Sequence, residues 1–285
     1  MLRQRNATAL LGAIFLLALV AGASAQSSQL IKRTTSKTDK FDFGSGGTVS
    51  ITGAPSGSIR VVGSSKNVIE ITAEIEIQAP NEADLAILAG VTTFITEEST
   101  GRVGIVTVGT HNKLGDKKLW RKFPKQLMDI PFRIDYTISV PRYCDLQIDN
   151  GKGDLSVSGV EGLIRINSVA SDTKLSLIGG GLMGTFGTGS VEITMPDRSW
   201  RGNTIDVQLV SGTMSVHLPV NLSADLDAVV LKSGTIENSF SSFKPRDRKA
   251  QFTDRSIIAK AGTGGVAMKF AVSDGTIKLL PIEVK

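Results

Sequence analysis

The residue types that most often carry catalysis are sparse in this chain. Histidine, the usual general base and a common metal ligand, occurs only as His111 and His217, and neither has a cysteine or acidic partner at metal-ligand spacing. No Gly-x-Ser-x-Gly turn is present to expose a nucleophilic serine. The glycine clusters at 179–181 and 262–265 lack the Lys-Ser/Thr of a phosphate-binding loop. We therefore predict no catalytic residue, no cofactor-binding residue and no metal ligand.

Two pairs of aspartates have a spacing that deserves a chemical check. Glycoside cleavage needs two carboxyl groups roughly 5–10 Å apart. Asp149 and Asp154 are close in sequence, and Asp225 and Asp227 would face the same side of a strand. Solvated surface acids produce the same pattern, and we favour that interpretation. The Gly-Gly-x-Gly-x-Asp repeat that binds calcium is absent.

The most unusual segment runs from Lys113 to Arg133. It holds seven basic and two acidic residues, and Trp120 and Phe123 lie among them. Basic residues interleaved with aromatics suit an anionic surface such as phospholipid head groups or acidic polysaccharide, although a solvated loop between two strands would look alike. The candidate contacts with an anionic surface are Lys117, Lys118, Trp120, Arg121 and Lys122.

The elements that must position this segment are predicted to be strands. Residues 68–77 alternate strictly, with isoleucines on one side and glutamates on the other, so one face is buried and one is solvated. Similar runs occur at 48–52, 58–62, 102–108 and 133–140. One short helix is expected after Pro80, with Asn81 as its N-cap and Gly90 at its C-terminal end. Residues 41–140 therefore form an N-terminal β region.

The second half of the chain contains a recurring phrase. A small polar residue, then Gly or Asp, then a strand with alternate apolar positions begins near 150, 171, 188, 211 and 233, and again at 273. The first five copies lie 17 to 23 residues apart. A period near 20 residues indicates stacked rungs that share one core. We predict an all-β protein in which residues 141–285 form a β-solenoid, resembling a single-stranded β-helix; a β-sandwich of hairpins is the alternative.

The N-terminus has the order of a secretory signal. Arg3 and Arg5 precede an apolar run, and a small-x-small site ends at Ala25, which predicts a signal peptide over 1–25 and a mature start at Gln26. An uncleaved anchor is the alternative reading. Residues 26–40 are polar and predicted to be flexible. Cys144 is the only cysteine, so no internal disulfide can form, and we expect it to be a buried apolar residue.

The sequence resembles the bacterial family of unknown function labelled "putative adhesin", whose members are exported β-solenoid or β-roll repeat domains. The likeness covers roughly residues 40–285. It implies an exported or envelope-associated β-helical domain and no established catalytic residues. Asp172 and Asp274 stand near the place of the turn glycine. The phrases that carry the resemblance are GSIRV at 57–61, ISVP at 138–141, DLQI at 145–148, NGKGDL at 150–155 and the Ser-Gly-Thr repeats that follow.

These observations favour a non-enzymatic, exported binding or adhesion-like module of the bacterial cell envelope. It would reside in the periplasm, on the cell surface or in the medium. The alternatives are a self-associating envelope scaffold, one edge of which Pro281, Glu283 and Lys285 would blunt, and a polysaccharide-acting β-helix enzyme. No cofactor is implied. An anionic glycan, a membrane surface or another envelope protein would be the partner, and the mild net charge of +5 does not indicate nucleic acid.

Overall fold

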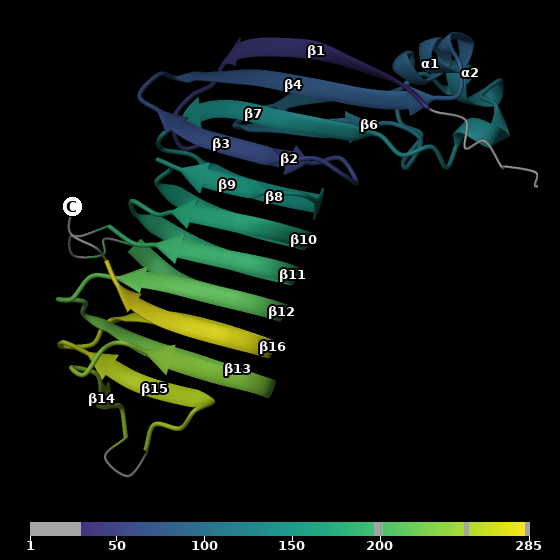
Figure 1. The fold of residues 1–285 in the computed structure, drawn as a ribbon. Coiled ribbons are helices and arrows are strands. Elements are labelled where there is room, and N and C mark those ends of the chain that lie inside the picture. Colours follow the sequence, from purple (N-terminus) through teal and green to yellow (C-terminus); the bar gives the residue numbers. More distant parts are fainter. Residues whose placement is uncertain (1–29, 197–199, 201, 248–250, 283–285) are drawn as a thin grey trace, which may run out of the picture.

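The computed structural model describes residues 30–196, 200, 202–247 and 251–282. The predicted signal peptide and its cleavage site after Ala25 lie outside these residues. The fold is all-β, as predicted, with short helices at one end (Figure 1). The helices are α1 (Glu82–Ala89), α2 (Lys117–Arg121) and the 3-10 turn η1 (Lys125–Leu127). The strands are β1 (Ile31–Asp42), β2 (Thr48–Thr52), β3 (Ile59–Ser64), β4 (Val68–Ala79), β5 (Thr93–Ser99), β6 (Arg102–Val108), β7 (Arg133–Pro141), β8 (Asp145–Lys152), β9 (Leu155–Ser158), β10 (Gly162–Ser176), β11 (Gly180–Thr194), β12 (Gly202–Leu218), β13 (Ala224–Asn238), β14 (Lys244–Pro245), β15 (Ser256–Ala261) and β16 (Val266–Pro281).

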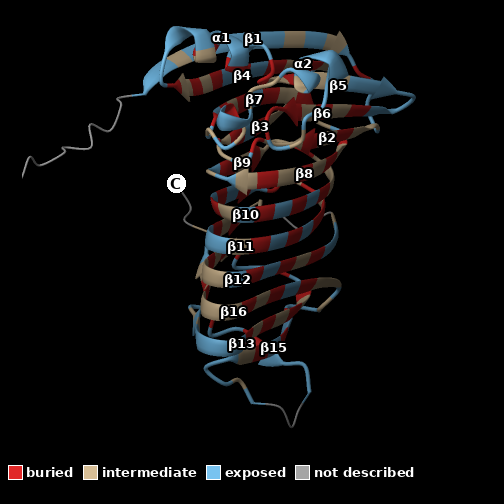
Figure 2. Ribbon diagram, turned by 90° about the vertical axis from the view of Figure 1, so that its right-hand side faces the viewer, coloured by how far each residue is buried: buried red, intermediate tan, exposed pale blue. Residues whose placement is uncertain are grey.

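The strands form two faces that enclose one core. Along one face the order is β1-β4-β7-β3-β9, and along the other β5-β6-β2-β8. The first half of β10 pairs with β8 and its second half pairs with β9, so each long strand crosses from one face to the other. We call these two sides the β8 face and the β9 face. Buried and exposed positions alternate along the strands, which places the Val, Ile and Leu side chains between the faces (Figure 2).

Beyond β10 the strands stack in parallel register. The order continues β10-β11-β12-β16-β13, and the antiparallel strands β15 and β14 follow at the end. The chain's last strand is therefore inserted between β12 and β13. The prediction that Pro281 blunts an outer edge is wrong, because Pro281 pairs with Leu218 of β12. The recurring phrase in the sequence indicates where strands begin. It contains no information on the order in which those strands pair.

The recurring glycine lies where each strand passes from one face to the other. At Gly212 the backbone has a φ of 141°, and a Cβ there would lie 1.8 Å from the carbonyl oxygen of Gly189 on the next strand. Only glycine combines that conformation with so close an approach. Ser171 holds this position in β10, in register with Gly189. Asp172 and Asp274 therefore do not occupy the glycine position. Asp172 follows this position by one residue in β10, and Asp274 precedes it by one residue in β16. The equivalent glycines are Gly57, Gly153, Gly189, Gly212, Gly234 and Gly275.

Two local predictions have different outcomes. The helix after Pro80 is confirmed, because the Asn81 side chain accepts a hydrogen bond from Asp84 N and Gly90 ends α1, with Leu85 and Leu88 buried. The flexible segment is wrong over its second part, since Ile31–Asp42 is strand β1, paired antiparallel along the whole of β4. β1 is an edge strand with most side chains exposed, so it lacks the apolar alternation of a half-buried strand.

Candidate functional site

The basic segment connects β6 to β7 and is folded rather than extended. It contains α2 and η1 where the sequence indicated a loop. The Asp116 carboxylate accepts a hydrogen bond from Lys118 N at 2.8 Å and caps α2. The Trp120 indole donates its N–H to the Leu114 carbonyl oxygen at 2.8 Å, and its ring centre lies 5.1 Å from that of Phe123. Phe123 packs on the main core, so the segment is attached to the body of the protein at a defined place.

The predicted basic contacts lie together on this short helix. Lys117, Lys118, Arg121 and Lys122 are exposed, and no acidic side chain in the described part of the chain pairs with any of them. Trp120 is only half-buried, and its polar atom is already used within the segment. We call these five residues, together with Leu119, the α2 patch. The structure thus brings together all five candidates that the sequence proposed.

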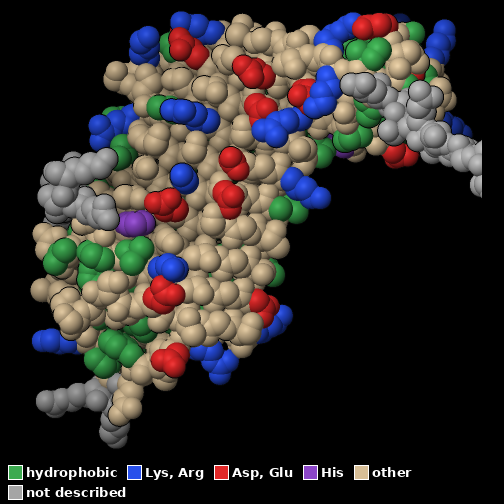
Figure 3. Space-filling model, viewed as in Figure 1, with side chains coloured by type: hydrophobic (Ala, Val, Ile, Leu, Met, Phe, Trp, Pro, Cys, Tyr) green, Lys and Arg blue, Asp and Glu red, His purple; other side chains and the backbone are tan. Residues whose placement is uncertain are grey.

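An apolar hollow adjoins the α2 patch. It has a volume of about 260 Å³ and lies between α1 and α2, which Figure 1 places at the same end of the molecule. Leu119 is 49% exposed and Ile87 of α1 is 38% exposed, so two large aliphatic side chains border the hollow beside the basic groups. Sequence reasoning missed Ile87 and Leu119. The sequence held one indication of the exposed Ile87. It is an apolar residue of α1 in addition to Leu85 and Leu88, the two that the helix buries. In Figure 3, basic side chains lie around the end that carries the helices, with acidic and hydrophobic ones among them, and the strand stack shows mainly other side chains and backbone with scattered charges.

Neither histidine belongs to the α2 patch. His111 packs its ring on Phe132 at 5.5 Å, and burial lowers its pKa. His217 lies 3.5 Å from a carboxylate oxygen of Glu192 on the neighbouring strand β11. Across residues 30–196, 200, 202–247 and 251–282, no group of three or more His, Cys, Asp or Glu side chains is arranged to hold a metal ion.

Three of the four aspartates with glycoside-like spacing contact neighbouring groups. Asp227 forms an ion pair with Arg246, and Asp149 accepts a hydrogen bond from the Asn167 amide at 2.8 Å. Asp225 has only a long contact of 3.5 Å with Gly265 N.

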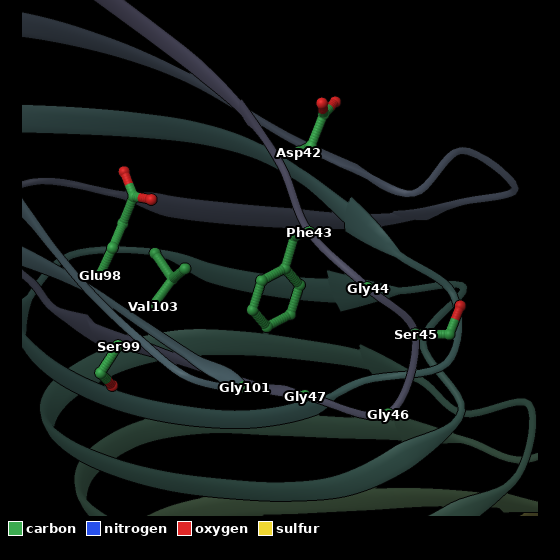
Figure 4. A pocket seen from close by; sticks show the side chains of 10 residues that line it. All are labelled: Asp42, Phe43, Gly44, Ser45, Gly46, Gly47, Glu98, Ser99, Gly101 and Val103. Atoms are coloured by element: carbon green, nitrogen blue, oxygen red, sulfur yellow. The ribbon is translucent and has the colours of Figure 1, made fainter.

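Another hollow, with acidic groups on its wall, lies beside the loop after β1. Figure 4 shows the Asp42 and Glu98 carboxylates on either side of it, with the Phe43 ring between them. Its volume is about 460 Å³, and the rest of its wall is mainly the glycine-rich segment 44–47. Its two carboxylates belong to no group of three or more His, Cys, Asp or Glu side chains among the described residues, and no basic side chain lines this hollow.

Cys144 is buried and chemically silent in the folded protein. Its residue is 2% exposed, and burial together with the nearby Asp145 carboxylate raises the pKa of the thiol to about 12. At pH 8 a thiol with that pKa is thiolate in only about one molecule in ten thousand, and the thiolate is the reactive form. The location agrees with the expectation of a buried apolar residue.

We expect Cys144 to resist a disulfide reagent at pH 8 until the chain unfolds. The thiol should react at least about a hundredfold faster in denaturing urea than in buffer, because unfolding restores both access and an ordinary pKa. Absorbance of the released thiolate and the mass of the single adduct measure this. A native rate within tenfold of the denatured rate would show that the residue is accessible.

Comparison with known proteins gives distant structural likeness. Neither a family model nor a curated protein matches the sequence. A putative cell adhesion protein from Clostridium sporogenes is similar over 88% of this chain and 100% of its own, at 11% identity and a TM-score of 0.43. A putative adhesin from Bacteroides fragilis covers 87% and 97% at 12% identity and a TM-score of 0.27. A putative lipid binding protein from Parabacteroides distasonis covers 87% and 97% at 10% identity and a TM-score of 0.22. All three are distant, and the function proposed below rests on the residues of this chain.

Proposed function

We propose that this protein is an exported, non-enzymatic binding module of the bacterial cell envelope. Its in-register parallel strands form a β-solenoid, which holds the α2 patch at one end. The patch binds an anionic surface. Export rests on the predicted signal peptide, and among the described residues no helix has the length and apolar character needed to cross a bilayer.

The observation that carries this proposal is the composition of the α2 patch. Four exposed basic side chains, which have no acidic partner among the described residues, lie on or next to α2, and one of them, Lys122, lines an apolar hollow that exposes Leu119 and Ile87. Cations attract an anionic surface at long range, and exposed aliphatic groups gain free energy when they enter the boundary between head groups and acyl chains. An acidic polysaccharide would use the cations but not the aliphatic groups. Anionic phospholipid therefore matches the patch better than the other surface that the sequence suggested.

The scaffold alternative has less support from the structure. End-to-end growth requires an open strand edge. The first half of β13, the last parallel strand, is covered by β15, and its second half receives further backbone contacts. The Val230 and Ile236 amides donate to the carbonyl oxygens of Arg255 and Asp254. The outermost strand at this end, β14, is only two residues long and pairs with Lys260 and Ala259 of β15.

We expect the mature protein to sediment with vesicles that contain 30% phosphatidylglycerol in phosphatidylcholine. Binding should fall by at least about tenfold between 50 and 300 mM NaCl, because salt screens exposed charges. Pure phosphatidylcholine vesicles should bind weakly. Equal sedimentation with both vesicle types, or none with the anionic ones at 50 mM NaCl, would refute the proposal.

A further inference from the structure

A second recognition surface lies on the β8 face, away from the helices. Two hollows are aligned there, one of about 440 Å³ over β5, β6 and β2 and one of about 270 Å³ over β8, β10, β11 and β12. Arg102 at the first hollow donates a hydrogen bond to the Gln147 amide oxygen at the second, at 3.4 Å, and so links them. We call the two hollows together the β8-face trough. It runs across the strands.

The strand register explains why the two hollows lie in line. Side chains at equivalent positions of neighbouring strands form rows perpendicular to the strands, spaced by about 4.8 Å. Two such rows, separated by two residues along each strand, border the trough. The first row is Glu97, Gly104, Ser50, Gln147, Arg165, Met183 and Asp206, and the second is Ile95, Val106, Thr52, Asp149, Asn167, Thr185 and Gln208. From β5 to β12 the rows span roughly 29 Å.

The lining combines donors and acceptors and carries charges of both signs. Arg102 and Arg165 are accompanied by Glu97, Glu98, Asp149 and Asp206, so two positive groups face four negative ones. Neutral amides and hydroxyls supply the remaining polar atoms. A polyanion or a polycation would meet groups of its own sign along this surface, whereas an uncharged polymer would not.

Several of these groups retain free hydrogen-bonding capacity. In the part of the chain that the structure describes, Arg165 makes no side-chain hydrogen bond or ion pair, and neither do Glu97 and Glu98. The bond between Gln208 and Asp206 is long, at 3.4 Å. Met183, which lies between Arg165 and Asp206 in the first row, is 50% exposed and offers an apolar contact. Gly104 has no side chain, which lets a ligand approach the backbone of β6.

We propose that the β8-face trough binds a linear, uncharged polysaccharide lying across the strands. Sugar hydroxyls both donate and accept hydrogen bonds, so they match a lining in which carboxylates, amides and a guanidinium alternate. The C–H faces of the rings would contact Met183. Because the α2 patch is the proposed contact with an anionic surface, one molecule that uses both sites would hold a glycan chain near that surface.

The test uses the mature full-length chain and a panel of linear hexasaccharides of glucan, mannan and chitin type, measured by calorimetry. We expect at least one neutral hexasaccharide to bind, and Arg165→Ala to weaken it by at least about fivefold. Lys174→Ala is the matched control, because Lys174 is an exposed basic residue of the same strand on the β9 face. It should change the affinity less than twofold. Thr185→Trp, which fills the trough, should abolish binding while thermal unfolding shows that the fold is retained.

Four outcomes would overturn this proposal. They are the absence of binding by every neutral hexasaccharide at millimolar concentration, equal weakening by Arg165→Ala and Lys174→Ala, tighter binding of a hexauronate, and tighter binding of an extended peptide. The result is independent of the α2 patch. Glycan affinity should be unchanged when Lys117, Lys118, Arg121 and Lys122 are neutralised, so failure of the vesicle experiment and failure of this one can be told apart.

Discussion

Replacing Gly212 with alanine will destabilise the protein by about 3–4 kcal/mol in free energy of unfolding. Two costs add at this position. The backbone φ of 141° belongs to a region that side chains rarely adopt, and the new Cβ would lie 1.8 Å from the carbonyl oxygen of Gly189. That oxygen belongs to the backbone of the next strand and cannot rotate away. Gly275 approaches Gly212 in the same manner from the other side, so a shift of β12 would disturb both neighbours.

Thermal unfolding followed by circular dichroism measures this effect. For a chain of this size the expected fall in Tm is roughly 6–16 °C. Two other glycines separate the contributions. Gly101 has a φ of 70° but nothing within 4 Å of a Cβ, so Gly101→Ala should cost only about 1 kcal/mol. Gly44 has neither a positive φ nor a close neighbour, and Gly44→Ala should be almost neutral. If Gly212→Ala were no worse than Gly101→Ala, the close strand approach would be disproved.

The glycine positions show what the sequence could and could not reveal about the fold. The Ser-Gly-Thr phrase marks a local requirement, the backbone conformation at each change of face, and it is readable because only glycine satisfies it. The stacking order is a long-range property. β16 lies between β12 and β13 because of pairings that are separated by many residues, and all the parallel strands present similar alternating Val, Ile and Leu positions to their neighbours. Nothing local distinguishes one order from another.

The candidate site, too, could be predicted only in part, because some of its features are local and others depend on the fold. The charges of the 113–125 segment are visible in the sequence because they are consecutive. The apolar hollow is formed by α1 and α2, whose residues Ile87 and Leu119 are far apart in the chain, and only the fold brings them together. The β8-face trough was not foreseen at all. Its rows draw single side chains from seven strands, and their alignment depends on the register of six pairings.

Neutralising the α2 patch should reduce affinity for anionic vesicles by roughly a thousandfold. Each basic residue near an anionic membrane contributes about 1 kcal/mol, and four of them contribute about 4 kcal/mol. The variant carries Gln at Lys117, Lys118, Arg121 and Lys122. These side chains are exposed and make no ion pair among the described residues, so the substitutions should leave the fold intact. Vesicle sedimentation at 50 mM NaCl measures the loss, and the remaining binding should no longer depend on salt.

The decisive comparison is with a variant of equal net charge. The control variant carries Gln at Arg60, Lys66, Lys152 and Lys174. It also removes four positive charges, but from exposed side chains on other parts of the molecule, and these side chains likewise lack ion pairs within the described residues. If attraction arose from net charge alone, both variants would lose affinity equally. If the α2 patch is the contact, the control should lose less than about tenfold. Leu119→Ser tests the apolar contribution separately. It should weaken vesicle binding while retaining the full salt dependence, because the four cations remain and only the aliphatic contact with the bilayer boundary is removed.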